Sequence, residues 1–187
     1  MVTAARTVVR LSGCKPAHAR VLSRQNTVWV FGLPASLACL VFARPDGNVP
    51  AAVTTAVVGI LVGSESDRER MQPALEELDK RGIAYEFSVR SAHRRPDEVA
   101  DYCRSARDRG LKVLICGAGL SAALPGVAAA HSELPVIGVP LRSSLSVLDG
   151  LDALLAITQM PPGVPVAAVG VDNAKNAAVL AARILGV

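Results

Sequence analysis

The 187-residue sequence has few aromatic side chains, since Phe, Tyr and Trp together make up only 3% of it. Proteins that bind single-stranded nucleic acids stack the bases on such rings, so this scarcity disfavours that class of protein. The four cysteines form no CxxC pair and do not cluster with histidines, which disfavours a disulfide scaffold and a zinc site. Hydrophobic residues reach 51%, enough for a sizeable core of Ala, Val, Leu and Ile.

Acidic residues are absent from positions 1–45, which hold six basic residues. The other fourteen Lys and Arg share residues 46–187 with all sixteen Asp and Glu, a net charge of −2 there. The net charge of +4 for the whole chain therefore originates in its first segment. It does not indicate a nucleic-acid partner for the part of the chain that looks able to fold.

Residues 1–55 show neither helical nor alternating periodicity. The uncharged stretch 25–43 is interrupted by Gly32, Pro34 and Ser36, and it is too short and broken for a membrane span. Three interpretations stay open: a signal peptide, an organelle transit peptide, or a non-functional extension that results from a start codon placed too early. We expect a poorly ordered extension here, with a separate domain over residues 56–187.

From residue 56 onward, short apolar runs alternate with amphipathic stretches. Residues 57–62 form an unbroken apolar run, typical of a parallel strand covered on both faces. Residues 66–81 carry apolar side chains at helical spacing, and Ser66 and Glu69 fit a capping box. We predict further strands at 83–89, 113–116, 136–139 and 166–170, and further helices between Pro96 and Gly110, at about 121–131, at 149–157 and around 177–184.

Strands that alternate with helices at this spacing pair in parallel through right-handed crossovers. The predicted fold class is therefore α/β, a three-layer doubly wound parallel sheet of about five strands, flavodoxin-like in type. Ligands of such folds bind beyond the carboxyl ends of the strands, where the strand order reverses. This rule nominates the loops that start at Gly63, Arg90, Gly117 and Pro140.

The first of these loops contains Gly63, Ser64, Ser66 and Asp67. Backbone N–H groups, hydroxyl groups and the positive end of a helix suit an anion such as phosphate. The loop is not a GxGxxG motif and has no Walker lysine, so ordinary dinucleotide or NTP binding is not indicated. Plain helix capping by Ser66 or Asp67 is the competing interpretation.

The second loop contains Ser91, His93 and Arg94. An imidazole just past a strand end is a candidate proton carrier, and a guanidinium beside it can hold a phosphate or carboxylate through two hydrogen bonds. A solvated loop that caps the next helix is the alternative. Arg95 fits that alternative better than Arg94, because it directly precedes the predicted helix.

The third loop, Gly117, Ala118 and Gly119, has side chains small enough for a flat ligand to approach the backbone, or simply for tight strand–helix packing. A proline-rich segment, 159–165, is rigid enough to reach a site or a neighbouring subunit. The remaining histidines and cysteines carry no motif, so we expect His18 and His131 to be structural or solvated and Cys103 and Cys116 to be buried thiols.

Several motifs, taken in order, resemble those of the PurE family, the N5-carboxyaminoimidazole ribonucleotide mutases of purine biosynthesis, over about residues 57–187. They are GSESD at 63–67, SAHRRP at 91–96, GAG and ALPG within 117–126, LPVIGVPL at 134–141, LDGLDALLAITQMPPGVPVA at 148–167 and NAAVLAARIL at 176–185. The resemblance implies conversion of N5-carboxyaminoimidazole ribonucleotide to 4-carboxy-5-aminoimidazole ribonucleotide without a metal or organic cofactor.

The resemblance also implies roles for individual residues. It makes His93 the catalytic residue, and it makes Ser64, Ser66, Asp67, Ser91 and Arg94 the groups that hold the ribose phosphate; we add Gly63, Gly117, Ala118 and Gly119 as substrate-binding positions. It further implies a homo-octamer with sites at subunit junctions. The partner would be a small ribonucleotide, with no nucleic acid or membrane, and the compartment the cytoplasm unless residues 1–55 direct the chain to an organelle.

One departure from the family pattern lies in the third loop. The mutases of this family carry a second histidine two residues before the position of Pro125, and this chain has Ala123 there. The related carboxylases, which use CO2 and aminoimidazole ribonucleotide directly, also lack that histidine. A mutase, a direct carboxylase and a non-catalytic ribonucleotide-binding module are therefore all hypotheses for this sequence, with the GAG, ALPG and QMPPG motifs favouring the mutase.

Overall fold

The computed structural model describes residues 55–146 and 148–187. The predicted extension, residues 1–55, lies outside these ranges except for Thr55. His18, Cys14 and Cys39 lie outside them too.

The described residues form one parallel sheet in the order β2-β1-β3-β4-β5, in which every pair of neighbouring strands is parallel. The elements along the chain are β1 (Val58–Val62), a 3-10 turn η1 (Glu65–Asp67), α1 (Arg68–Lys80), β2 (Tyr85–Val89), α2 (Pro96–Ala106), β3 (Val113–Gly119), α3 (Ala123–His131), β4 (Val136–Leu141), α4 (Leu151–Thr158), β5 (Ala167–Ala168) and α5 (Ala174–Leu185). The predicted α/β class with a five-stranded, doubly wound parallel sheet is confirmed.

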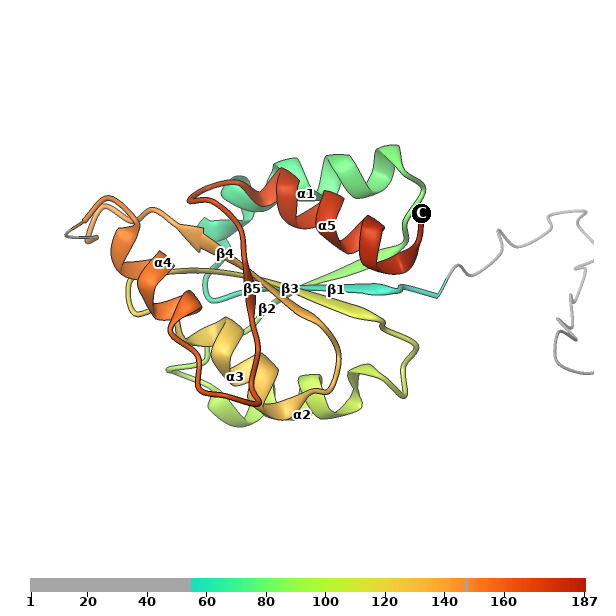
Figure 1. Cartoon of the computed structure of the whole chain (residues 1–187), viewed down its shortest axis with the longest axis horizontal. Helices are drawn as coiled ribbons and strands as arrows, with labels where there is room; N and C mark the ends of the chain where they lie inside the picture. The colour runs from blue at the N-terminus through green and yellow to red at the C-terminus, as the bar shows by residue number, and fades with distance from the viewer. Residues whose placement is uncertain (1–54, 147) are drawn as a thin grey trace, which may run out of the picture. The chain divides into compact units, whose positions relative to one another are not determined.

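Helices cover both faces of the sheet. Figure 1 shows α1 and α5 packed together on one face, with α2 and α3 on the other. Each face has its own hydrophobic core: one joins the strands to α1 and α5, and the other joins them to α2, α3 and α4. Strand β1 is buried along its whole length because Ile60 points into the first core and Leu61 into the second.

The start of α1 differs from the predicted capping box. Helix α1 begins at Arg68, and the residue before it, Asp67, makes no side-chain capping hydrogen bond. The turn η1 tightens the entry to the helix, and Ser64 caps that turn by accepting a hydrogen bond from the Ser66 backbone N–H. Ser66 therefore lies within the turn and does not cap α1.

Strands β3 and β5 differ most from their predicted lengths, whereas β2 and β4 each differ by two residues. Strand β3 continues to Gly119, because the run of small residues that looked like a loop pairs with β4 as far as Leu141. Strand β5 has only two residues, although 166–170 was predicted. It is an edge strand that pairs with β4 alone, and Pro165 before it has no N–H to donate.

The expectation of buried thiols is confirmed for Cys103 and Cys116, which are both free and buried. Within 55–146 and 148–187 the structure contains no helix long and apolar enough to cross a membrane.

We predict that Gly138 in β4 is required for close packing of the sheet against α4. A Cβ atom at this position would lie 2.5 Å from Cγ2 of the buried Ile157 and 3.1 Å from Cγ1 of Val166. Gly138→Ala should therefore lower the free energy of unfolding by about 1–3 kcal/mol, measured by urea denaturation at fixed protein concentration.

Gly170→Ala is the matched control, because a Cβ atom there would meet nothing closer than 3.7 Å. It should leave the free energy of unfolding within about 1 kcal/mol of the parent value. Equal stability of the two variants would contradict this account of Gly138.

Candidate active site

A cavity of about 400 Å³ lies beyond the carboxyl ends of the strands. Its wall is built by the segments after β1, β2 and β4 and by the end of β3 with the turn after it. Strand order reverses between β1 and β3, because the chain places β2 on one side of β1 and β3 on the other. The cavity therefore occupies the position at which doubly wound folds bind ligands.

Nine of the ten predicted site residues line this cavity. They are Gly63, Ser64, Ser66, Asp67, Ser91, His93, Arg94, Ala118 and Gly119. The tenth, Gly117, is not part of the wall. A Cβ atom on Gly117 would lie 2.7 Å from Sδ of Met71, so this glycine faces α1 and permits the helix to pack on the sheet.

The first loop brings two hydroxyl groups together at the cavity. Ser64 has an extended backbone, and its Oγ accepts hydrogen bonds from the Ser66 hydroxyl at 2.9 Å and from the Ser66 N–H at 3.4 Å. The Asp67 N–H donates to the Ser64 carbonyl at 3.1 Å, which closes the turn. Hydroxyl donors at the start of a helical segment are arranged to receive an anionic group.

The carboxyl group of Asp67 lies in the same wall and is partly buried. Burial raises the pKa of Asp67 above its ordinary value, while a hydrogen bond from the Ser64 backbone and the charge of Arg70 act in the opposite direction. Burial is the largest of these effects, so the folded protein disfavours the ionised form of this carboxyl group.

The second loop positions Arg94 toward the cavity. Ser91 is buried, and its Oγ accepts hydrogen bonds from the Arg94 N–H at 3.3 Å and from Arg94 Nε at 3.4 Å. Arg90 and Arg95 are instead both paired with Glu98, at 3.7 and 3.4 Å. Within the described ranges Arg94 makes no ion pair, so its charge is available to a ligand.

His93 lies in the same wall and is exposed. Its ring nitrogen Nε2 is 3.2 Å from the hydroxyl oxygen of Ser121, which comes from the turn between β3 and α3. This contact joins the second loop to the third. Ala123, at the position where the resemblance expected a histidine, also lines the cavity.

The segment after β4 contributes three lining residues that sequence reasoning did not name: Arg142, Ser143 and Leu145. The strand-end rule had nominated this loop, and a cation directly after an apolar strand was the available signal. The Arg142 N–H donates to Oδ1 of Asp172 at 3.0 Å, and Asp172 also pairs with Arg70 at 2.9 Å. Asp172, in the turn before α5, therefore connects the cavity wall at Arg142 to α1 at Arg70.

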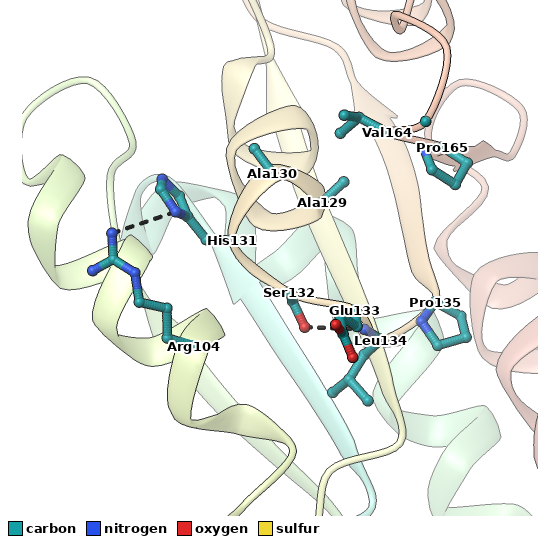
Figure 2. A pocket seen from close by; sticks show the side chains of 11 residues that line it. Arg104, Ala129, Ala130, His131, Ser132, Glu133, Leu134, Pro135, Val164 and Pro165 are labelled. Atoms are coloured by element: carbon teal, nitrogen blue, oxygen red, sulfur yellow. Dashed lines mark hydrogen bonds between the residues drawn. The ribbon is translucent and has the colours of Figure 1, made fainter.

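A larger cavity, of about 800 Å³, lies at the other end of β4 (Figure 2). Arg104 and His131 face one another across its rim, with Arg104 Nη2 3.5 Å from His131 Nδ1. Gly163, Val164 and Pro165 line it, so this part of the proline-rich segment does not reach the candidate site of its own chain. None of the predicted site residues lies here, and the smaller cavity is the better candidate for chemistry.

The side chains around the candidate site indicate which ligands it can take. In the part of the chain that the structure describes, no three His, Cys, Asp or Glu side chains gather closely enough to hold a metal ion. What the cavity offers is hydroxyl groups, one unpaired guanidinium, one imidazole and a wall of small apolar residues, a set suited to a phosphorylated ligand and to proton transfer.

We predict that Asp67 lowers the stability of the protein at neutral pH. A carboxyl group whose pKa is raised by folding stabilises the protein below its unfolded pKa, and this contribution is lost as pH rises through the folded pKa. Asp67→Asn should therefore raise the free energy of unfolding at pH 7, and the gain should shrink as the pH falls through the pKa of Asp67.

The measurement is chemical denaturation of both proteins between pH 4 and pH 7. Asp108→Asn, which changes an exposed carboxylate outside the cavity wall, is the control and should have almost no effect at pH 7. A less stable Asp67→Asn protein at pH 7 would contradict the prediction.

Comparison with known proteins identifies the family of the chain. The family model described as AIR carboxylase matches residues 57–187. The N5-carboxyaminoimidazole ribonucleotide mutase of Pyrococcus horikoshii is 52% identical over 131 residues, 70% of this chain and 73% of the relative. A phosphoribosylaminoimidazole carboxylase of Schizosaccharomyces pombe is 51% identical over 138 residues, which are 74% of this chain and 25% of the relative.

The crystal structure of Treponema denticola PurE superposes with a TM-score of 0.61 at 34% sequence identity, over 69% of this chain and 79% of that one. The match of the family model covers all five strands and all five α-helices of the described residues. The chain therefore belongs to the AIR carboxylase (PurE) family, as its motifs predicted.

Proposed function

We propose that this protein is an N5-carboxyaminoimidazole ribonucleotide mutase, an enzyme that moves the carboxyl group from the exocyclic nitrogen to the ring carbon C4. The observation that carries the proposal is the meeting of the first-loop hydroxyl groups, Arg94 and His93 in one cavity. Relatives that bear this name are about half identical to the chain, for example 53% for that of Thermotoga maritima. The reaction belongs to purine biosynthesis.

In this proposal the ribose phosphate is held by the first two loops. The Ser64 hydroxyl donates a hydrogen bond to the phosphate, and the Ser66 hydroxyl exchanges its bond to Ser64 Oγ for one to the phosphate. Arg94, held in place by Ser91, supplies the positive charge. An ionised carboxylate would repel the phosphate, so Asp67 is assigned to the ribose. There its carboxyl group accepts a hydrogen bond from a hydroxyl group. Anchoring the sugar phosphate fixes the imidazole ring in one place relative to His93.

The reaction needs one bond broken, one bond formed and one proton moved. The C–N bond of the carbamate breaks and releases CO2, and the electron pair stays on nitrogen. The ring carbon C4 then attacks CO2 and loses its own proton. Overall the proton passes from C4 to the nitrogen, and His93 is the group proposed to carry it.

Released CO2 must be recaptured before it escapes. Ala118 and Gly119 contribute small side chains to the wall, and Leu124 and Leu145 add apolar surface. CO2 is small and uncharged, so such a wall holds it near C4 without binding it tightly. Proximity is the main contribution that an enzyme without a cofactor can make to this step.

A direct carboxylase is the second candidate function. Ala123 lines the cavity where the resemblance expected a histidine, and relatives in Schizosaccharomyces pombe and Vigna aconitifolia, 51% and 50% identical, are named phosphoribosylaminoimidazole carboxylase. These relatives are about four times longer than the matched segment, because it covers 25% and 24% of their length. Their names therefore describe proteins with further parts.

We predict that the purified protein converts N5-carboxyaminoimidazole ribonucleotide to 4-carboxy-5-aminoimidazole ribonucleotide in buffer depleted of bicarbonate, measured by the absorbance of the product. His93→Asn should fold and bind the product but lose at least about a hundredfold in kcat. With 13C-bicarbonate present, early product should be unlabelled, since the carboxyl group comes from the substrate.

Label in the earliest product, or turnover of aminoimidazole ribonucleotide with bicarbonate alone, would favour the carboxylase. Thermal stabilisation by the ribonucleotide without turnover would favour a non-catalytic binding module. Near-parent activity of His93→Asn would exclude His93 as the proton carrier.

We further propose that the protein acts as a homo-octamer, as the family resemblance implies, with the cytoplasm as its compartment. Four leucines on α4 and the loop before it are between 46% and 75% exposed: Leu145, Leu148, Leu151 and Leu155. Such a cluster is unusual on a monomer and supports burial against another copy of the chain. Leu145 also lines the candidate site, which supports sites at subunit junctions.

We predict that Leu151→Lys combined with Leu155→Lys shifts the protein to smaller species, because charged side chains would have to be buried in the subunit contact. Sedimentation velocity at micromolar concentration measures this. Ala156→Lys, on another face of α4, is the control and should assemble like the parent. An unchanged distribution in the double variant would contradict the prediction.

A further inference from the structure

The turn between β3 and α3 has strained backbone on both sides of Ser121. Leu120 has φ of +56° and Ala122 has φ of +36°, the left-handed region that side chains other than glycine rarely adopt. Each such residue lowers the free energy of unfolding by on the order of 1 kcal/mol or more. The conformation persists only where the surrounding structure requires it. Strain on both sides of a single residue indicates that the placement of this residue matters.

The strained turn is closed and partly buried. The Ala122 N–H donates to the Gly119 carbonyl at 3.0 Å, and the Ala122 side chain is buried in the core beneath α3. Leu120, Ala122 and Ala123 line the cavity. The turn therefore leaves little freedom to Ser121, which stands between the lining residues Leu120 and Ala122.

The turn after β3 forms a contact with the loop after β2. It brings the hydroxyl oxygen of Ser121 to 3.2 Å from Nε2 of His93, 28 residues earlier in the chain. Within residues 55–146 and 148–187, Ser121 is the only residue that the imidazole hydrogen-bonds. In the absence of this contact the ring would be free to rotate on an exposed loop.

We propose that Ser121 is a positioning residue for His93, an inference that rests on the proposed mutase reaction. A serine hydroxyl donates a hydrogen bond to a neutral ring nitrogen and accepts one from a protonated ring nitrogen. His93 therefore keeps its partner when it takes up the proton from C4 and when it gives that proton to the exocyclic nitrogen. The ring stays in one orientation throughout the transfer.

Ser121→Ala removes the hydroxyl group and leaves the turn intact. Its kcat should fall about tenfold, roughly the value of one hydrogen bond to a group that becomes charged, while KM changes by less than about twofold. Ser121→Thr keeps a hydroxyl group and should recover most of the lost kcat. Ser144→Ala changes an exposed serine outside the cavity wall and should match the parent.

A second measurement does not depend on turnover. In 15N NMR of protein labelled in histidine, the Nε2 resonance of His93, assigned from its loss in His93→Asn, should shift in Ser121→Ala and return toward the parent position in Ser121→Thr. An unchanged resonance would overturn the proposal whether or not the protein is a mutase.

The remaining outcomes separate the two proposals. If the parent protein fails to convert the carbamate substrate but the resonance shifts, the proposed reaction is wrong and the Ser121–His93 contact stands. Three outcomes in an active parent would show that Ser121 does not position His93. They are an unchanged kcat in Ser121→Ala, a change in its KM alone, or a kcat that falls equally in Ser121→Ala and Ser121→Thr.

Discussion

The parallel pairing of β1, β3 and β4 is the constraint on which the site depends. The register aligns Val62 with Gly117 and Gly119 with Leu141, so these strands end at the same edge of the sheet. Parallel strands that end together bring the segments after them together as well. Residues that lie tens of positions apart in the chain thereby form one cavity wall, and no individual loop has to be long.

The sequence predicted the class of fold and the composition of this wall better than it predicted local boundaries. Apolar runs such as 57–62 and the strand-end rule depend on burial and on parallel pairing, which act over the whole domain. The end of β3 was misplaced because glycine and alanine suit a loop, and only pairing with β4 makes 117–119 a strand. The capping box at Ser66 was wrong because local spacing does not reveal the preceding 3-10 turn.

Contacts between side chains that lie far apart in the chain could not be predicted from the sequence. Arg142 comes after an apolar strand like many surface cations, and its link to Asp172 depends on how the turn before α5 meets the end of β4. The link between Ser121 and His93 likewise arises from a left-handed turn that no periodicity indicates. Gly117 illustrates the opposite case, because its motif suggested a ligand and its neighbour is Met71.

Asp172 has a consequence for any protein engineered from this chain. Its carboxylate bridges Arg70 of α1 and the backbone of Arg142, its own N–H donates to the Pro140 carbonyl, and α5 begins two residues later. The turn before α5 is thus held at the edge of the candidate cavity. A purification tag or fusion partner that displaces α5 would therefore also displace the wall of the candidate site, whereas one that leaves the Asp172 contacts intact would not.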